Sequence, residues 1–137
     1  MGILDQLKGK KKVNVLEAEL TGAQSEPVIS HKTYQMKFMF DWGSGCCVWT
    51  TNDAARNLYG GYPILTEQLP VSAQLKAALD RLIDKHDEAL DWDYPPNALL
   101  WNEAQVEAFE AEAIAAYKQL CIELGEEYEV VLWPNLI

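Results

Sequence analysis

The residues with the clearest potential for chemistry are carboxylates that crowd one short stretch of the chain. Five acidic side chains fall within ten residues, two aromatic side chains lie among them, and one more tryptophan follows: Asp84, Asp87, Glu88, Asp91, Trp92, Asp93, Tyr94 and Trp101. The commonest meaning of such a cluster is a solvated helix face. The aromatic residues favour a docking surface for a basic partner, because aromatics surrounded by charge are frequent interface anchors. A metal site is the third interpretation, but the ligand order of an EF-hand and a His-x-x-x-His pair are both missing.

A second candidate surface is the short segment formed by Asp41, Trp42 and Ser44, which lies at the tip of a predicted hairpin. Hairpin tips protrude and offer contacts to partners. A plain turn without a binding role is the commoner alternative. This segment therefore ranks behind the acidic cluster.

The sequence lacks the common catalytic motifs. Ser44 stands in Gly-Ser-Gly-Cys rather than in the Gly-x-Ser-x-Gly order of a nucleophile elbow, and neither a Walker A motif nor a dinucleotide fingerprint occurs. A nucleophile at Cys47 or Ser44 would need a nearby base. The two histidines of the chain, His31 and His86, are the candidates for that base. We therefore predict no catalytic residue, no cofactor and no metal, and keep a small enzyme that uses Cys47 or the acidic helix face as an alternative.

Charge is spread unevenly along the 137 residues. Residues 67–137 carry fifteen acidic against four basic side chains, residues 13–66 carry five against three, and residues 1–12 carry one against four. The acidic half repels nucleic acid and anionic membranes and speeds encounter with basic partners. We expect a basic protein partner, no nucleic acid or membrane partner, and a chain that is itself a monomer or a homodimer.

Cysteine usage and the start of the chain point to the cytoplasm. Cys46, Cys47 and Cys121 cannot all pair, which fits a reducing compartment, and residues 1–12 do not have the order of a signal peptide. Because neighbours on a strand point to opposite faces, we expect one of Cys46 and Cys47 to be buried and the other to face outward.

Apolar periodicity predicts strands at residues 13–20, 34–40, 46–51 and 128–133, with the second and third joined as a hairpin. The segment around Ile64 and Leu65 is expected to be a loop. Residues 1–12 are expected to form a flexible basic arm, and residues 13–137 a single domain.

Three helices are predicted from capping residues and apolar stripes. A short helix is expected after Asn52 or Asp53 and before Gly60, and two long helices after Ser72 and after Asn102. Strands followed by segregated helices are typical of an α+β fold. We predict an antiparallel sheet of about four strands, with the two long helices and the short one packed on one face.

The chain resembles the small acidic immunity proteins that bacteria encode beside polymorphic toxins. The resemblance covers most of the chain and is carried by its size, its acidity and its layout, with these segments: Met36-Lys37-Phe38-Met39-Phe40-Asp41-Trp42-Gly43-Ser44-Gly45, Cys47-Val48-Trp49, Gly61-Tyr62-Pro63-Ile64, Leu90-Asp91-Trp92 and Trp101-Asn102. It implies a cytoplasmic protein without enzymatic activity that binds a cognate toxin domain and blocks it sterically. Acidic and aromatic residues would then meet a basic cleft.

The leading hypothesis is a protein-binding module that acts as an immunity-type inhibitor. Its first rival is a structural or adaptor domain that self-associates through a sheet edge or exposed aromatics. The small enzyme is the second rival.

Overall fold

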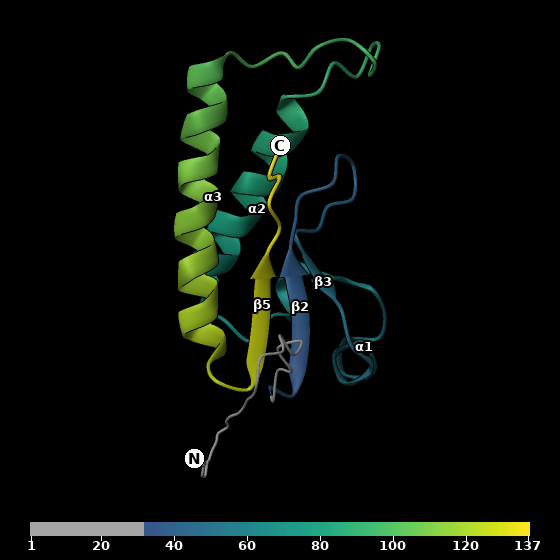
Figure 1. Cartoon of the computed structure of the whole chain (residues 1–137), viewed down its shortest axis with the longest axis vertical. Helices are drawn as coiled ribbons and strands as arrows, with labels where there is room; N and C mark the ends of the chain where they lie inside the picture. Colours follow the sequence, from purple (N-terminus) through teal and green to yellow (C-terminus); the bar gives the residue numbers. More distant parts are fainter. Residues whose placement is uncertain (1–31) are drawn as a thin grey trace, which may run out of the picture. The chain divides into compact units, whose positions relative to one another are not determined.

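The computed structural model describes residues 32–137, which form a four-stranded sheet with three α-helices and one 3-10 turn (Figure 1). In chain order the elements are β2 (Tyr34–Phe38), β3 (Val48–Thr50), α1 (Asp53–Tyr59), β4 (Pro63–Ile64), η1 (Thr66–Gln68), α2 (Ala73–Glu88), α3 (Glu103–Leu124) and β5 (Tyr128–Leu132). This confirms the α+β class. The predicted basic arm at 1–12 and the predicted strand at 13–20 lie outside the described residues.

The predicted hairpin is confirmed as β2 and β3. The two strands pair antiparallel, with Met36 opposite Thr50 and Phe38 opposite Val48. Met36 and Phe38 are fully buried because alternate side chains of β2 face the core. In the connection between the strands, Gly43 and Gly45 both have positive φ angles. Residues other than glycine rarely adopt this backbone conformation.

The predicted helix starts are also confirmed. The side chains of Asn52, Ser72 and Asn102 each accept a hydrogen bond from a backbone amide in the first turn of the helix that follows. Asn102 and Gln105 form a reciprocal capping box at the start of α3. These signals are local, so they are readable from spacing alone.

The sheet is mixed rather than wholly antiparallel, which corrects our prediction. Its strand order is β4-β3-β2-β5, and β5 runs parallel to β2, with Tyr34 opposite Tyr128 and Phe38 opposite Leu132. Figure 1 supplies the reason: α2 runs up the molecule and α3 runs back down, so the chain re-enters the sheet at the end where β2 begins. A strand that starts beside the start of β2 must run parallel to it.

The described sheet also contains a short strand in a segment that we predicted to be a loop. Pro63 and Ile64 form the short edge strand β4, with Ile64 opposite Val48. A run of two residues is too short for an alternating pattern, so only pairing with β3 reveals it.

One hydrophobic core joins the helices to one face of the sheet. It includes side chains from β2, from β5 and from each of the three α-helices, among them Phe38, Ala55, Leu79, Phe109 and Val130. A hydrogen bond also joins α3 to β5, because the Tyr117 hydroxyl donates to the Val130 carbonyl oxygen at 2.7 Å.

Candidate functional site

The loop between α2 and α3 is organised by the carboxylate of Asp91. This carboxylate accepts hydrogen bonds from the side-chain amide of Asn97 at 2.9 Å and from the backbone amides of Asp93 and Tyr94 at 3.1 and 3.2 Å. These hydrogen bonds lower the pKa of Asp91; the bond from Asn97 has the largest effect, and the bonds from the backbone amides add to it. Asp91 therefore shapes the loop and has few acceptor positions left for a partner.

The same loop presents large apolar side chains to solvent. Trp92 is 55% exposed and Tyr94 is 59% exposed. The Trp92 indole N–H donates to the Asp87 carbonyl oxygen at 2.7 Å, which fixes one edge of the ring. Leu100, at 62% the most exposed of the three, was not among the predicted site residues; its amide donates to the Ala89 carbonyl oxygen at 2.8 Å and closes the base of the loop.

The hairpin tip is fastened to the end of α2, so the two candidate clusters are neighbours. The indole N–H of Trp42 donates to the His86 carbonyl oxygen at 2.8 Å, and the amide of Gly43 donates to Oδ1 of Asp87 at 3.0 Å. A Cβ atom on Gly43 would lie 3.4 Å from the Trp92 ring, so the tip also touches the loop. Within the tip, the Ser44 hydroxyl donates to the Asp41 carbonyl oxygen at 2.7 Å.

We call the combined region the acidic–aromatic surface. Its exposed or half-exposed members come from the hairpin tip, the outer side of α2 and the following loop: Asp41, Trp42, Ser44, Asp84, Glu88, Trp92, Asp93 and Tyr94. Asp87 and Asp91 support it through the hydrogen bonds described above. Trp101 is half-buried: it packs on Phe109 with ring centroids 5.4 Å apart and lines a hollow together with Glu88.

Four carboxylates of the surface have no hydrogen bond or ion pair with any residue in 32–137: those of Asp41, Asp84, Glu88 and Asp93. Asp84 and Glu88 are four residues apart on α2, a spacing at which like charges repel. The nearest cation in sequence, Lys85, bonds instead to Glu112 of α3 at 3.1 Å. Asp80 extends this exposed row by one turn; the spacing of four could have identified it, but it was not predicted.

His86 is the buried centre beneath this surface. It is 2% exposed, and its ring stacks on Trp42 with centroids 4.6 Å apart and on Phe40 at 5.4 Å. Its Nε2 atom has no hydrogen-bond partner among the described residues. Burial lowers the pKa of His86, although the nearby charges of Asp87 and Asp41 oppose this effect.

Acidification is therefore expected to destabilise the protein in a window that begins near pH 6.5, the ordinary pKa of histidine. The unfolded chain binds the proton more tightly than the folded chain does, so the free energy of unfolding falls as pH drops below 6.5 and levels off below the folded pKa. Urea unfolding above and below this pH measures the effect. His86→Phe keeps an aromatic ring in the stack and should flatten the pH dependence; an unchanged slope would assign it to another group.

Comparison of the sequence with known protein families identifies the family of this chain. A family model described as Serratia CdiI immunity protein-like matches residues 34–135. The chain belongs to this immunity-protein family. The match confirms the resemblance to immunity proteins of polymorphic toxin systems and implies a protein partner, the cognate toxin. No curated protein matches the sequence.

The cysteines of this immunity-family chain are poor candidates for catalysis. Cys46 and Cys47 are both buried, which corrects the prediction that one would face outward; they precede β3 rather than alternate along it. Burial raises the pKa of the Cys47 thiol far above its usual range, which disfavours the thiolate form that a nucleophile needs. This fits the non-catalytic role typical of immunity proteins.

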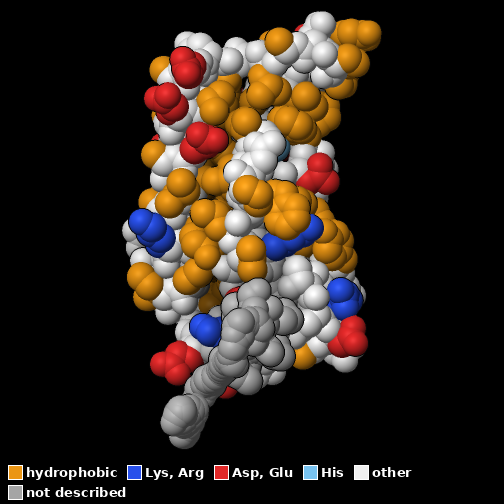
Figure 2. Space-filling view, in the orientation of Figure 1, with side chains coloured by type: hydrophobic (Ala, Val, Ile, Leu, Met, Phe, Trp, Pro, Cys, Tyr) orange, Lys and Arg blue, Asp and Glu red, His pale blue; other side chains and the backbone are white. Residues whose placement is uncertain are grey.

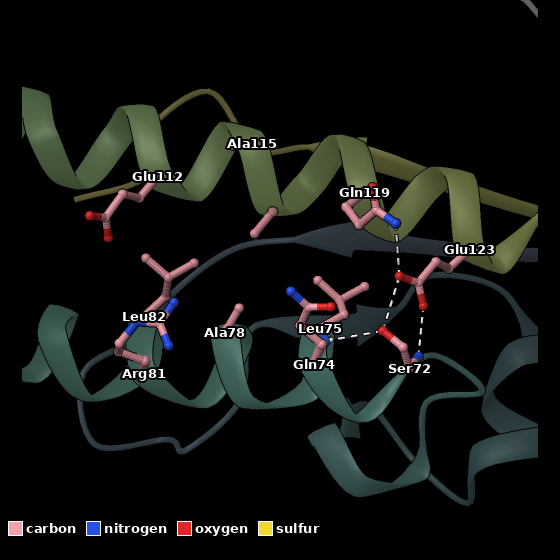
Figure 3. A pocket seen from close by; sticks show the side chains of 11 residues that line it. Ser72, Gln74, Leu75, Ala78, Arg81, Leu82, Glu112, Ala115, Gln119 and Glu123 are labelled. Atoms are coloured by element: carbon pink, nitrogen blue, oxygen red, sulfur yellow. Dashed lines mark hydrogen bonds between the residues drawn. The ribbon is translucent and has the colours of Figure 1, made fainter.

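A groove of about 590 Å³ lies between α2 and α3 of this family member (Figure 3). At one end the Glu123 carboxylate accepts hydrogen bonds from the amide of Ser72 at 2.6 Å, from its hydroxyl at 3.1 Å and from the side chain of Gln119 at 2.8 Å. Bonds from Gln119 and from Ser72 lower the pKa of Glu123. These groups join the start of α2 to the end of α3, so this end of the groove is a packing seam.

Two further properties of the described residues bear on function. Among residues 32–137, no three His, Cys, Asp or Glu side chains stand close enough together to hold a metal ion. In the same part of the chain, no helix combines the length and apolar character needed to cross a membrane.

Proposed function

We propose that the chain neutralises a toxin domain by docking its acidic–aromatic surface onto a basic surface of that domain. The observation that carries this proposal is the union of exposed Trp92 and Tyr94 with the unpaired carboxylates of Asp84, Glu88 and Asp93 on one surface. Membership in an immunity-protein family supplies the class of partner.

The energetics of the surface support a cationic partner. Asp84 and Glu88 repel each other in the free protein, and cations of a partner would relieve that repulsion. Close charge pairs across an interface speed association and contribute several kcal/mol in favourable cases. Trp92 and Tyr94 would supply the apolar area that charges alone do not, which is the usual role of aromatic anchors.

The hydrogen bonds divide the carboxylates into two groups with different roles. Asp87 and Asp91 hold the hairpin tip and the loop in place, through bonds to Gly43 and to Asn97 respectively. Asp41, Asp84, Glu88 and Asp93 remain available to the toxin. A charge test should therefore leave Asp87 and Asp91 intact.

The double variant Asp84→Lys with Asp93→Lys is expected to slow association with the toxin domain about 10- to 100-fold at low salt. Its association rate should also depend less on salt, because fewer attractive charges remain to be screened. Stopped-flow mixing with the purified toxin domain over a range of ionic strength measures both quantities.

The matched control is Glu107→Lys with Glu126→Lys, which changes the net charge equally at exposed positions on and after α3. The control should retain most of the association rate. Equal losses in both variants would mean that overall charge, rather than the acidic–aromatic surface, guides binding. Unchanged kinetics in the first variant would remove this surface from the interface.

A further inference from the structure

The outward face of the sheet, opposite the core, is apolar at its centre. Lys37 of β2 lies between Trp49 of β3 and Val131 of β5 in the strand register, and Met36 and Phe38 on either side of it face the core. In the orientation of Figure 1, β2 and β5 lie in front of α2. Figure 2 shows hydrophobic side chains gathered over this region around a basic group, with acidic groups toward the margins.

Lys37 is held at this face by aromatic rings. Its ammonium lies 4.5 Å from the ring centroid of Trp133 and 5.4 Å from that of Tyr62. These cation–π contacts leave it without an ion-pair partner among residues 32–137.

Glu129 supplies an opposite charge on the same face. Val130 points to the core, so Glu129 and Val131 point outward by the alternation of β5. The Glu129 side chain has no hydrogen bond or ion pair within residues 32–137. Glu129 and Trp133 lie two residues to either side of Val131, and the Lys37 ammonium lies over Trp133. The two charges thus flank the exposed Val131 along the strand direction.

We propose that this face binds a second copy of the chain in a symmetric dimer. A two-fold axis running across the strands near Val131 would stack the two sheets antiparallel and bring Lys37 of each copy to Glu129 of the other. An isologous interface needs such self-complementarity, because every contact occurs twice. Val131 is 49% exposed and Trp133 is 40% exposed, so the stacking also removes apolar area from water.

This proposal goes beyond toxin binding and uses none of the residues of the acidic–aromatic surface. A dimer formed through the sheet would leave that surface available on both copies. The two proposals can therefore fail separately: loss of dimerisation leaves the toxin complex to be measured on monomers, and loss of toxin binding leaves the dimer to be measured alone.

Sedimentation velocity of the full chain over a concentration series is the first test, and a reversible shift from one chain to two is expected. Lys37→Glu and Glu129→Lys, each alone, should weaken self-association at least about 10-fold, because each places like charges opposite one another twice. An equimolar mixture of the two variants should restore the dimer, since both ion pairs then re-form with reversed roles. Restoration on mixing also proves that the variants are folded.

The matched controls are Lys118→Glu and Glu107→Lys, which make the same charge changes at exposed positions on α3 and should leave the dimer intact. Three results would each overturn the proposal. These are a single chain at every concentration, self-association of the two single variants equal to that of the parent, and a mixture that stays monomeric.

Discussion

Replacing Trp92 with alanine is expected to weaken the toxin complex by about 2–4 kcal/mol, which is roughly 30- to 1000-fold in Kd. The reason is that Trp92 is a large, half-exposed ring whose position is already fixed by its hydrogen bond to the Asp87 carbonyl oxygen. A ring that is held in place before binding loses little conformational freedom on binding. Isothermal titration calorimetry with the purified toxin domain measures the change.

Two further variants separate the causes of such a loss. Trp92→Phe removes the N–H that reaches Asp87 but keeps a ring, so a smaller loss is expected. Tyr62→Ala removes an aromatic side chain of similar exposure on the outward face of the sheet and should leave toxin affinity nearly unchanged. Full affinity for Trp92→Ala would show that the loop is not an anchor and would move the interface elsewhere.

Truncation of Phe109 to alanine is expected to cost about 3–5 kcal/mol of folding free energy, a large fraction of the stability of a typical domain. Phe109 is almost fully buried, and its ring contacts three aromatic neighbours: Phe40 at 5.1 Å, Trp101 at 5.4 Å and His86 at 5.7 Å between centroids. Its loss would open a cavity where α3 meets the hairpin and α2. Chemical denaturation measures the cost.

Phe109→Leu is the graded control for this cavity. A leucine keeps most of the apolar volume and is expected to lose less stability than alanine does. Ile122→Ala removes an aliphatic side chain that is exposed on the same helix and should change stability little. If Phe109→Ala were as mild as Ile122→Ala, the aromatic cluster would not be the support of this region.

The two predictions concern two connected groups of residues, the buried aromatic cluster around His86 and the exposed acidic–aromatic surface. Phe109, Phe40 and Trp42 surround His86, and the backbone of His86 and the side chain of Asp87 in turn hold the hairpin tip. A substitution in the buried aromatic cluster should also disturb the acidic–aromatic surface, because the hairpin tip connects the two. Substitution of Trp92 alone should lower the affinity for the toxin domain without a matching loss of folding stability.

The acidic cluster and its aromatic residues were visible in the sequence, but their roles were not. Asp91 and Asp93 look alike as letters two positions apart, yet only Asp91 accepts three hydrogen bonds that shape the loop. The neighbourhood of Trp42 and Asp87 was not predicted either, because these residues are far apart in the chain and meet only through the fold. The predicted surface residues remain to be tested by the variants above.

The features that could be predicted from the residues alone depend on local interactions. The capping box of Asn102 and Gln105, the alternation of β2 and the glycines of the hairpin act over a few residues, so spacing was enough to predict the helices and the hairpin. Three other features depend on the folding of the whole domain: β5 runs parallel to β2, Cys46 and Cys47 are both buried, and the hairpin tip contacts α2. Those features depend on where two long helices return the chain and on which groups then compete for the same hydrogen bonds, and no local pattern encodes either.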